Sequence, residues 1–109
     1  MKKVIITGSS AGLGKSLAKV FSETHDVYGI SRSKSEEHVK LYKTCDFSDL
    51  DSVHANIQEL TKDVDDFDYV ILNAGTLGDL KPVCETSIEE YKHVFNINVW
   101  SNKIILDYI

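Results

Sequence analysis

The segment Thr7–Ser16 carries three glycines at the point where an apolar run gives way to a helical pattern. Gly8 allows a sharp turn, Gly12 leaves no side chain between the backbone and an incoming anion, and Gly14 allows a helix to pack closely on a sheet. Backbone N–H groups at the start of that helix would face the anion, and the hydroxyl of Ser10 would add a donor. A glycine-rich connection without a ligand is the simpler alternative, but three glycines at a strand-to-helix junction favour a phosphate site.

The same segment ends in Gly14-Lys15-Ser16, which is also the end of the phosphate-loop motif GxxxxGK[ST]. That motif needs a glycine five positions before Gly14, where this sequence has Ser9. No later strand ends in an aspartate that could hold Mg²⁺, since the fourth apolar run ends in Leu72-Asn73. A nucleoside triphosphatase is therefore the less favoured alternative.

Alternating strands and helices position the glycine turn. Short apolar runs bounded by turn residues predict four strands, at Lys2–Thr7, Asp26–Ser31, Val39–Cys45 and Phe67–Leu72. Helical spacing predicts one helix after Gly12, a second capped by Ser48 and ending near residues 61–65, and a long final helix capped by Ser87. Residues 33–38 are predicted as a loop or a short weak helix, and residues 73–85 as a loop.

This order predicts an α/β fold, a Rossmann-type doubly wound parallel sheet with helices on both faces. We expect a single domain spanning residues 1–109 with about four strands. Right-handed crossovers place these strands in the order 3-2-1-4. Ligands bind such sheets at the carboxyl ends of the strands, where the strand order reverses. The glycine turn follows the first strand and lies at that point.

Composition excludes several classes of function. The 109 residues carry a net charge of −5, which argues against a nucleic-acid surface. The apolar runs are too short to span a membrane. Cys45 and Cys84 lack metal-ligand spacing and are predicted to be free thiols, which suits the cytoplasm. No metal site is expected, and the scattered histidines are interpreted as surface or core residues: His25, His38, His54 and His93.

The glycine spacing GxxxGxG resembles the TGxxxG[IL]G motif of the short-chain dehydrogenases/reductases, which Thr7–Gly14 matches at every fixed position. Three further family motifs follow in the family's order: Asp46 after the third strand, Asn73-Ala74-Gly75 after the fourth, and Asn98 in the final helix. The resemblance covers the whole chain and implies the N-terminal, cofactor-binding half of such an enzyme.

The resemblance also implies residue roles. Asp46 would contact the adenine ring of the cofactor beside Phe47, although a turn or cap role is the alternative; Ser48 is the better cap and would leave Asp46 free. Asn98 would be catalytic, by kinking its helix and holding a water in a proton relay. Asn96 competes for the same alignment, and a structural hydrogen bond is the other interpretation of Asn98.

Arg32 predicts which cofactor binds. It follows the second strand, where sites that prefer NAD usually carry an acid for the ribose 2′-hydroxyl. A guanidinium can instead pair with a 2′-phosphate through two hydrogen bonds. We therefore expect NADP(H), with Ser31 or Ser33 assisting, although an arginine on a solvated loop is the alternative. The predicted cofactor site comprises Gly8, Ser10, Gly12, Leu13, Gly14, Ser31, Arg32, Ser33, Asp46, Phe47, Asn73, Ala74 and Gly75.

The family's chemistry needs a tyrosine four residues before a lysine, and none of the five tyrosines meets this requirement. We therefore expect the chain to be the N-terminal half of a longer NADP(H)-dependent oxidoreductase that acts on a carbonyl or alcohol, and to be inactive by itself. A short non-catalytic NADP(H)-binding module remains the alternative. The fourth strand would be an open apolar edge without a fifth strand, so we also expect a homo-oligomer.

Overall fold

Four parallel strands form the sheet: β1 (Lys2–Thr7), β2 (His25–Ser31), β3 (Leu41–Thr44) and β4 (Tyr69–Ile71). The computed structural model describes residues 1–109 and confirms the predicted order β3-β2-β1-β4. In the register, Val4 of β1 pairs with Val27 of β2 on one side and with Tyr69 of β4 on the other. The carboxyl ends of all four strands therefore lie at one edge of the sheet.

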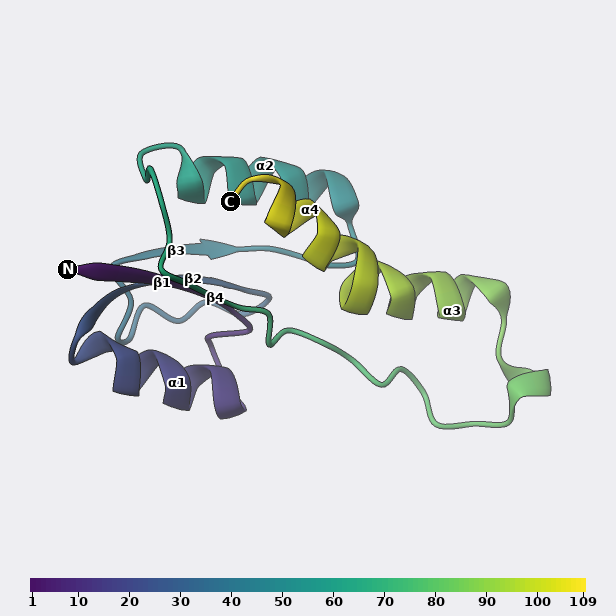
Figure 1. Cartoon of the computed structure of the whole chain (residues 1–109). Helices are drawn as coiled ribbons and strands as arrows, with labels where there is room; N and C mark the ends of the chain where they lie inside the picture. The colour runs from purple at the N-terminus through teal and green to yellow at the C-terminus, as the bar shows by residue number, and fades with distance from the viewer.

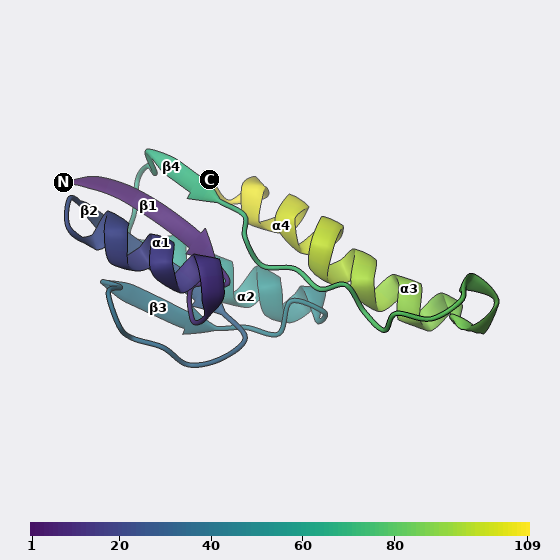
Figure 2. The same ribbon diagram turned by 90° about the horizontal axis from the view of Figure 1, so that it is seen from below.

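Helices cover both faces of this sheet (Figure 1). Helix α1 (Gly12–Ser22) lies on one face, and α2 (Leu50–Thr61) lies on the other beside α4 (Ser101–Asp107). Helix α3 (Ile88–Phe95) continues into α4 through a π-helical segment at Asn96–Trp100, and a short 3₁₀ turn at Val83–Glu85 precedes it. Figure 2 shows α3 and the loop before it extending beyond the sheet, which gives a molecule of 50 × 25 × 20 Å.

Side-chain alternation along β1 divides the core into two layers. Val4 and Ile6 pack with Ala18 of α1, whereas Ile5 packs with residues of α2 and α4 on the opposite face. All three β1 side chains are completely buried. Strands that are buried on both faces explain the nearly continuous apolar run that predicted β1.

Helix α2 begins one residue later than predicted. The side chain of Asp49, rather than Ser48, accepts the hydrogen bond from the Ser52 N–H, at 3.3 Å. Ser48 points back instead, and both its N–H (2.9 Å) and its hydroxyl (2.6 Å) donate to Asp46 Oδ1. The prediction of a Ser48 cap was therefore wrong, because Ser48 closes a local turn on Asp46.

Strand β3 is shorter than the predicted Val39–Cys45. His38 has φ 63°, a left-handed conformation that turns the chain just before the strand, and ladder pairing begins at Leu41 opposite Tyr28. Val39 packs in the core layer on the α1 side. Cys45 and Cys84 are both free, with Cys45 buried and Cys84 exposed.

The final helix begins as predicted at Ser87, which forms a capping box with Glu90. Its π-helical segment was not predicted. Within it the Ile97 carbonyl accepts the Ser101 hydroxyl (2.5 Å), and the Asn98 carbonyl accepts the Asn102 amide (3.0 Å). These side chains donate hydrogen bonds to backbone carbonyl groups in a segment where the regular α-helical hydrogen-bond pattern is interrupted.

Two apolar surfaces of this chain have no partner. Strand β4 pairs with β1 only, so its outer edge is open. Large apolar side chains on the final helix stay exposed: Ile88, Tyr91, Phe95, Val99, Trp100 and Leu106. Self-association stays a prediction. None of the helices has the length and apolar character that crossing a membrane requires.

Candidate functional site

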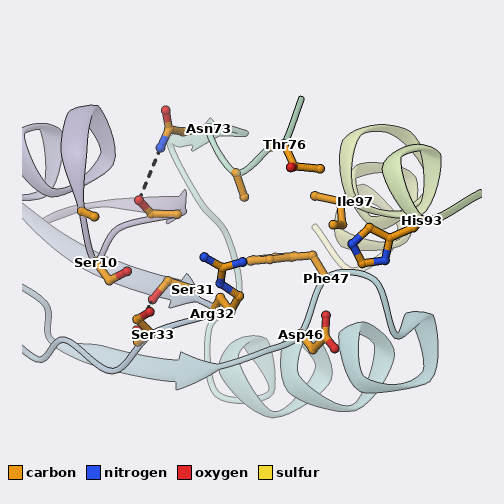
Figure 3. Close-up of a pocket in the computed structure, with 14 residues that line it drawn as sticks. Ser10, Ser31, Arg32, Ser33, Asp46, Phe47, Asn73, Thr76, His93 and Ile97 are labelled. Carbon is orange, nitrogen blue, oxygen red and sulfur yellow. Dashed lines mark hydrogen bonds between the residues drawn. The ribbon is translucent and has the colours of Figure 1, made fainter. Parts of the chain in front are cut away.

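A cleft of about 370 Å³ opens at the carboxyl ends of the strands (Figure 3). It lies between the glycine turn, the ends of β2, β3 and β4, and the final helix. Its lining residues are Gly8, Ser10, Ala11, Ser31, Arg32, Ser33, Asp46, Phe47, Asn73, Ala74, Gly75, Thr76, His93 and Ile97.

The glycine turn forms one wall of the cleft. Gly8 has φ 70° and donates a backbone hydrogen bond of 2.8 Å to the Ile30 carbonyl, which fixes the turn to β2. A Cβ on Gly14 would overlap the Gly8 carbonyl oxygen and the Asn73 amide, so only glycine fits between helix and strand there. Gly12 has φ 52°, and a Cβ on this residue would have no neighbour within 4 Å, so the turn is open above it.

Thr7 connects the end of β1 to the end of β4. Its buried hydroxyl oxygen accepts hydrogen bonds from the N–H groups of Asn73 and Ala74, each at 2.9 Å. The Asn73 side chain donates in turn to the Gly8 carbonyl, at 3.3 Å. The Asn-Ala-Gly segment is thereby held against the glycine turn, where it lines the cleft.

At the end of β2, Ser31 is buried and its hydroxyl donates to the Ser33 carbonyl (2.7 Å), which also accepts from the Tyr42 hydroxyl (2.8 Å). These bonds fix the backbone on both sides of Arg32. Arg32 itself is exposed to the cleft, and it takes part in none of the ion pairs of the chain. The site therefore holds an unpaired guanidinium.

Asp46 and Phe47 form the wall at the end of β3. The Ser48 hydroxyl and N–H donate to Asp46 Oδ1 and lower the pKa of its carboxyl group, and the charges of His93 and Arg32 lower it further. The expectation that Ser48 caps α2 and leaves Asp46 free was wrong for Oδ1, because the Ser48 turn uses that oxygen. Oδ2 has no hydrogen-bond partner in the chain, and Phe47 is buried beside it.

Asn98 and Asn96 face different parts of the molecule. The Asn98 side chain accepts from the Thr76 N–H (2.8 Å) and donates to the Thr76 carbonyl (2.7 Å). Asn96 instead donates to the Ser48 carbonyl, at 3.2 Å. Asn98 is therefore the residue that contacts the loop after β4, and it lines a separate groove beside Asn73–Leu77 rather than the main cleft.

Ten of the thirteen predicted cofactor residues line the main cleft. Gly12, Leu13 and Gly14 do not: Gly14 lies beneath the turn, and Leu13 is 66% exposed. Sequence reasoning missed four lining residues, namely Ala11, Thr76, His93 and Ile97. His93 was interpreted as an ordinary surface or core residue, but its four-residue spacing from Ile97 puts both on one helix face and could have indicated their shared position.

The structure argues against a phosphate loop, because Lys15 does not reach the cleft. Lys15 instead pairs with Glu37 at 3.5 Å. A lysine in a phosphate loop must reach the bound phosphates. The geometry around Gly14 therefore does not favour a triphosphatase.

The family model for short chain dehydrogenases matches residues 2–105. The chain belongs to this family. Short chain dehydrogenases are oxidoreductases that bind nicotinamide cofactors and act on small molecules.

Individual relatives are similar to this chain over almost its whole length. The (S)-benzoin-forming benzil reductase of Bacillus cereus is 29% identical, over 96% of this chain and 48% of the relative. An uncharacterized oxidoreductase of Schizosaccharomyces pombe is 36% identical, over 89% of this chain and 35% of the relative. The crystal structure of a short chain dehydrogenase family protein from Francisella tularensis superimposes with a TM-score of 0.83 at 28% identity. The match covers 98% of this chain and 44% of that protein. The chain thus spans less than half the length of these relatives.

The residues of the cleft fit a nicotinamide dinucleotide. Helix α1 begins after Ala11, which has no side-chain group to cap the helix, so no side chain serves its first N–H groups. Gly12 leaves the space above them open, and an anionic phosphate is the ligand that such a helix end favours. The unpaired Arg32 adds a cation at the neighbouring strand end.

Proposed function

We propose that this chain is the NADP(H)-binding portion of a cytoplasmic oxidoreductase that interconverts carbonyl and alcohol groups of a small molecule. Membership of the short chain dehydrogenase family supports the oxidoreductase class. The relatives are longer than this chain, so the reaction and the substrate class are part of the proposal.

The observation that carries the cofactor choice is Arg32 at the end of β2. Its guanidinium lines the cleft without an ion-pair partner, and its neighbours there are two serines rather than an acid. A 2′-phosphate carries close to two negative charges near neutral pH and would bind such a guanidinium through two hydrogen bonds. The ribose of NAD(H), with a hydroxyl in place of the phosphate, would gain much less from it.

The other predicted cofactor residues take the following roles in this proposal, and Gly12, Leu13 and Gly14 belong to the glycine turn rather than to the lining of the cleft. Gly8, Ser10, Gly12, Leu13 and Gly14 would form the turn that holds the pyrophosphate. The free Oδ2 of Asp46 would accept from the adenine amino group, and Phe47 would border the ring. Asn73, Ala74 and Gly75 would border the ribose on the inner side. Once bound, the nicotinamide ring supplies or accepts the hydride.

Asn98 is proposed as the catalytic residue of this chain, acting within a proton relay whose other members are not among these 109 residues. Its side chain is committed to the backbone of Thr76, so it would act by fixing the helix and the loop after β4. No tyrosine in the sequence stands four residues before a lysine. We therefore expect the 109-residue chain to bind the cofactor without reducing a carbonyl.

Titration with NADPH and NADH tests the cofactor assignment. We expect NADPH to bind more tightly, and Arg32→Ala to weaken NADPH binding by about 10- to 100-fold, the equivalent of one charge-assisted hydrogen-bonded pair, while NADH binding is unchanged. Lys34→Ala is the matched control, because Lys34 is a basic residue of the same loop that pairs with Glu36 at 3.7 Å and does not line the cleft.

Equal affinity for the two cofactors, or equal losses in the two variants, would refute the role of Arg32. Magnesium-ATP serves as the control ligand for the triphosphatase alternative. Tight binding of magnesium-ATP without any response to NADPH would refute the oxidoreductase proposal as a whole.

Self-association is part of the same proposal. The open outer edge of β4 and the exposed apolar side chains of the final helix support it, since such surfaces tend to pair with another chain. Light scattering at increasing protein concentration measures this directly. A constant monomeric mass would refute it.

A further inference from the structure

His93 lines the cleft, although none of the motifs in the sequence marks it as a site residue. It lies on α3, and its ring points into the cleft beside Ile97 and opposite Asp46 (Figure 3). The imidazole is exposed to the cleft and forms no hydrogen bond or ion pair with any other side chain of the chain. It is therefore a polar group that lines a binding cleft and has no structural partner.

The groups around His93 define one end of the cleft chemically. Asp46 is held in a fixed orientation by the Ser48 turn, and its Oδ2 remains a free acceptor. Phe47 and Ile97 supply apolar surface at the same end of the cleft. A carboxylate acceptor, an imidazole and an apolar wall together suit a flat heteroaromatic ring that carries an amino group, with anionic groups nearby.

We propose that His93 is a cofactor-binding residue at the adenosine end of the cleft and that it makes the affinity for NADP(H) depend on pH. This inference rests on the proposed function. Imidazole is the side chain that ordinarily gains a positive charge between about pH 8 and pH 5.5. A positive charge at this position adds to that of Arg32 and attracts the phosphates of the cofactor, so binding strengthens as His93 becomes protonated.

Other charged groups also face His93, and three of them are neutralised by ion pairs. Asp46 and Arg32 face it across the main cleft, and His93 also lines a second hollow between α3 and the loop before it. The titratable residues of that hollow are Asp79, Lys81, Glu89, Glu90 and Tyr91. Lys81 pairs with Glu90, and Glu89 pairs with Lys92 at 3.9 Å. Asp46 and Asp79 are the two acids here that form no ion pair.

The test compares His93→Gln with the unaltered chain at pH 5.5, 6.5, 7.5 and 8.5, with NADPH as the ligand. Glutamine keeps a polar side chain but cannot gain the charge. The 2′-phosphate also titrates in this range, near about pH 6. The ratio of the two dissociation constants removes that contribution, because both proteins bind the same ligand. We expect the dissociation constant of His93→Gln, divided by that of the unaltered chain, to lie within about twofold of one at pH 8.5. It should rise to about fivefold at pH 5.5.

Two further measurements locate the effect. His54→Gln is the matched control: His54 lies on α2, contacts Tyr108 at 3.1 Å and does not line the cleft, so its ratio should stay near one at every pH. Adenosine 2′,5′-bisphosphate contains only the adenosine end of the cofactor, and we expect it to give the same rise for His93→Gln. Thermal unfolding of both variants checks that each is folded.

A ratio for His93→Gln that stays constant across the pH range overturns the inference. A rise that appears with NADPH but not with the bisphosphate overturns the location at the adenosine end. Failure of the unaltered chain to bind NADPH at any pH is a different result, because it overturns the proposed function rather than the role of His93.

Discussion

Replacement of Thr7 by valine tests the connection that joins the fold to the cleft. The Thr7 hydroxyl oxygen accepts two backbone hydrogen bonds, from Asn73 and Ala74, at 2.9 Å each. Valine has nearly the same shape and the same preference for a strand, so the loss of the hydroxyl group is the main change. The substitution therefore removes both acceptor contacts and leaves two N–H groups without a partner.

The magnitude follows from the burial of these groups. A donor that loses its partner costs about 1–3 kcal/mol, and the cost is smaller where water can reach the group. Thr7 is completely buried, whereas Asn73 and Ala74 are half-buried. We therefore take the lower half of that range for each donor and expect Thr7→Val to lower the free energy of unfolding by about 3 kcal/mol in total.

The assay is urea denaturation, combined with amide hydrogen exchange at Asn73 and Ala74. Thr7→Ser is the control, since it keeps the acceptor oxygen and loses one methyl group, at a cost of about 1 kcal/mol. Exchange at both amides should accelerate in the valine variant more than in the serine variant. Equal unfolding free energies for the two variants would refute the reasoning, because packing alone would then explain the effect of Thr7.

Three further predictions concern neighbouring parts of the structure. Gly14→Ala should lower the free energy of unfolding by at least about 2 kcal/mol in urea, because the new Cβ would overlap the Gly8 carbonyl; a change below about 0.5 kcal/mol would contradict this close approach. Asp49→Ala should cost about 1 kcal/mol through loss of the α2 cap, whereas Ser48→Ala should leave the helicity of α2 unchanged by circular dichroism. The Ser48 hydrogen bonds lower the pKa of Asp46, so its ionised form stabilises the fold above about pH 3.9, and this stabilisation is lost as the pH falls through the lowered value. Urea titrations between pH 2.5 and pH 6 should therefore show a shallower loss of stability at low pH in Asp46→Asn, and identical curves would contradict it.

The strands and their order could be predicted because the signals for them are local and strong. The strand Lys2–Thr7 is buried from Val4 to Thr7 and is followed by Gly8, which has a positive φ, so sequence and structure agree at both of its ends. The start of α2 could not be predicted to the residue. Ser48 and Asp49 are both good caps, and the choice between them depends on the turn that Ser48 makes with Asp46.

The lining residues of the cleft could be predicted from the sequence where they belong to a motif. Those that reach the cleft only through the position of a helix could not. Arg32 and Asn73 follow strands whose ends must meet at one edge of a parallel sheet, so their proximity follows from the topology. His93 and Ile97 come from a helix that extends beyond the sheet, and its position depends on how the 73–85 loop returns. The π-helical segment has no sequence signature of its own, because the apolar pattern on either side of it remains helical.

The loop after β4 connects the cofactor cleft to the final helix. Thr7 holds its first residues, Asn73 and Ala74, while the side chain of Asn98 binds Thr76 only two residues later. Any change at Asn98 that frees Thr76 can therefore shift the segment that lines the cleft, although Asn98 itself does not line it. It follows that a loss of activity on substitution of Asn98, in a protein that also carries the tyrosine–lysine pair, does not by itself identify a role in proton transfer. Cofactor affinity has to be measured in the same variant, and only a loss of turnover with unchanged affinity assigns Asn98 to the chemistry rather than to the position of this loop.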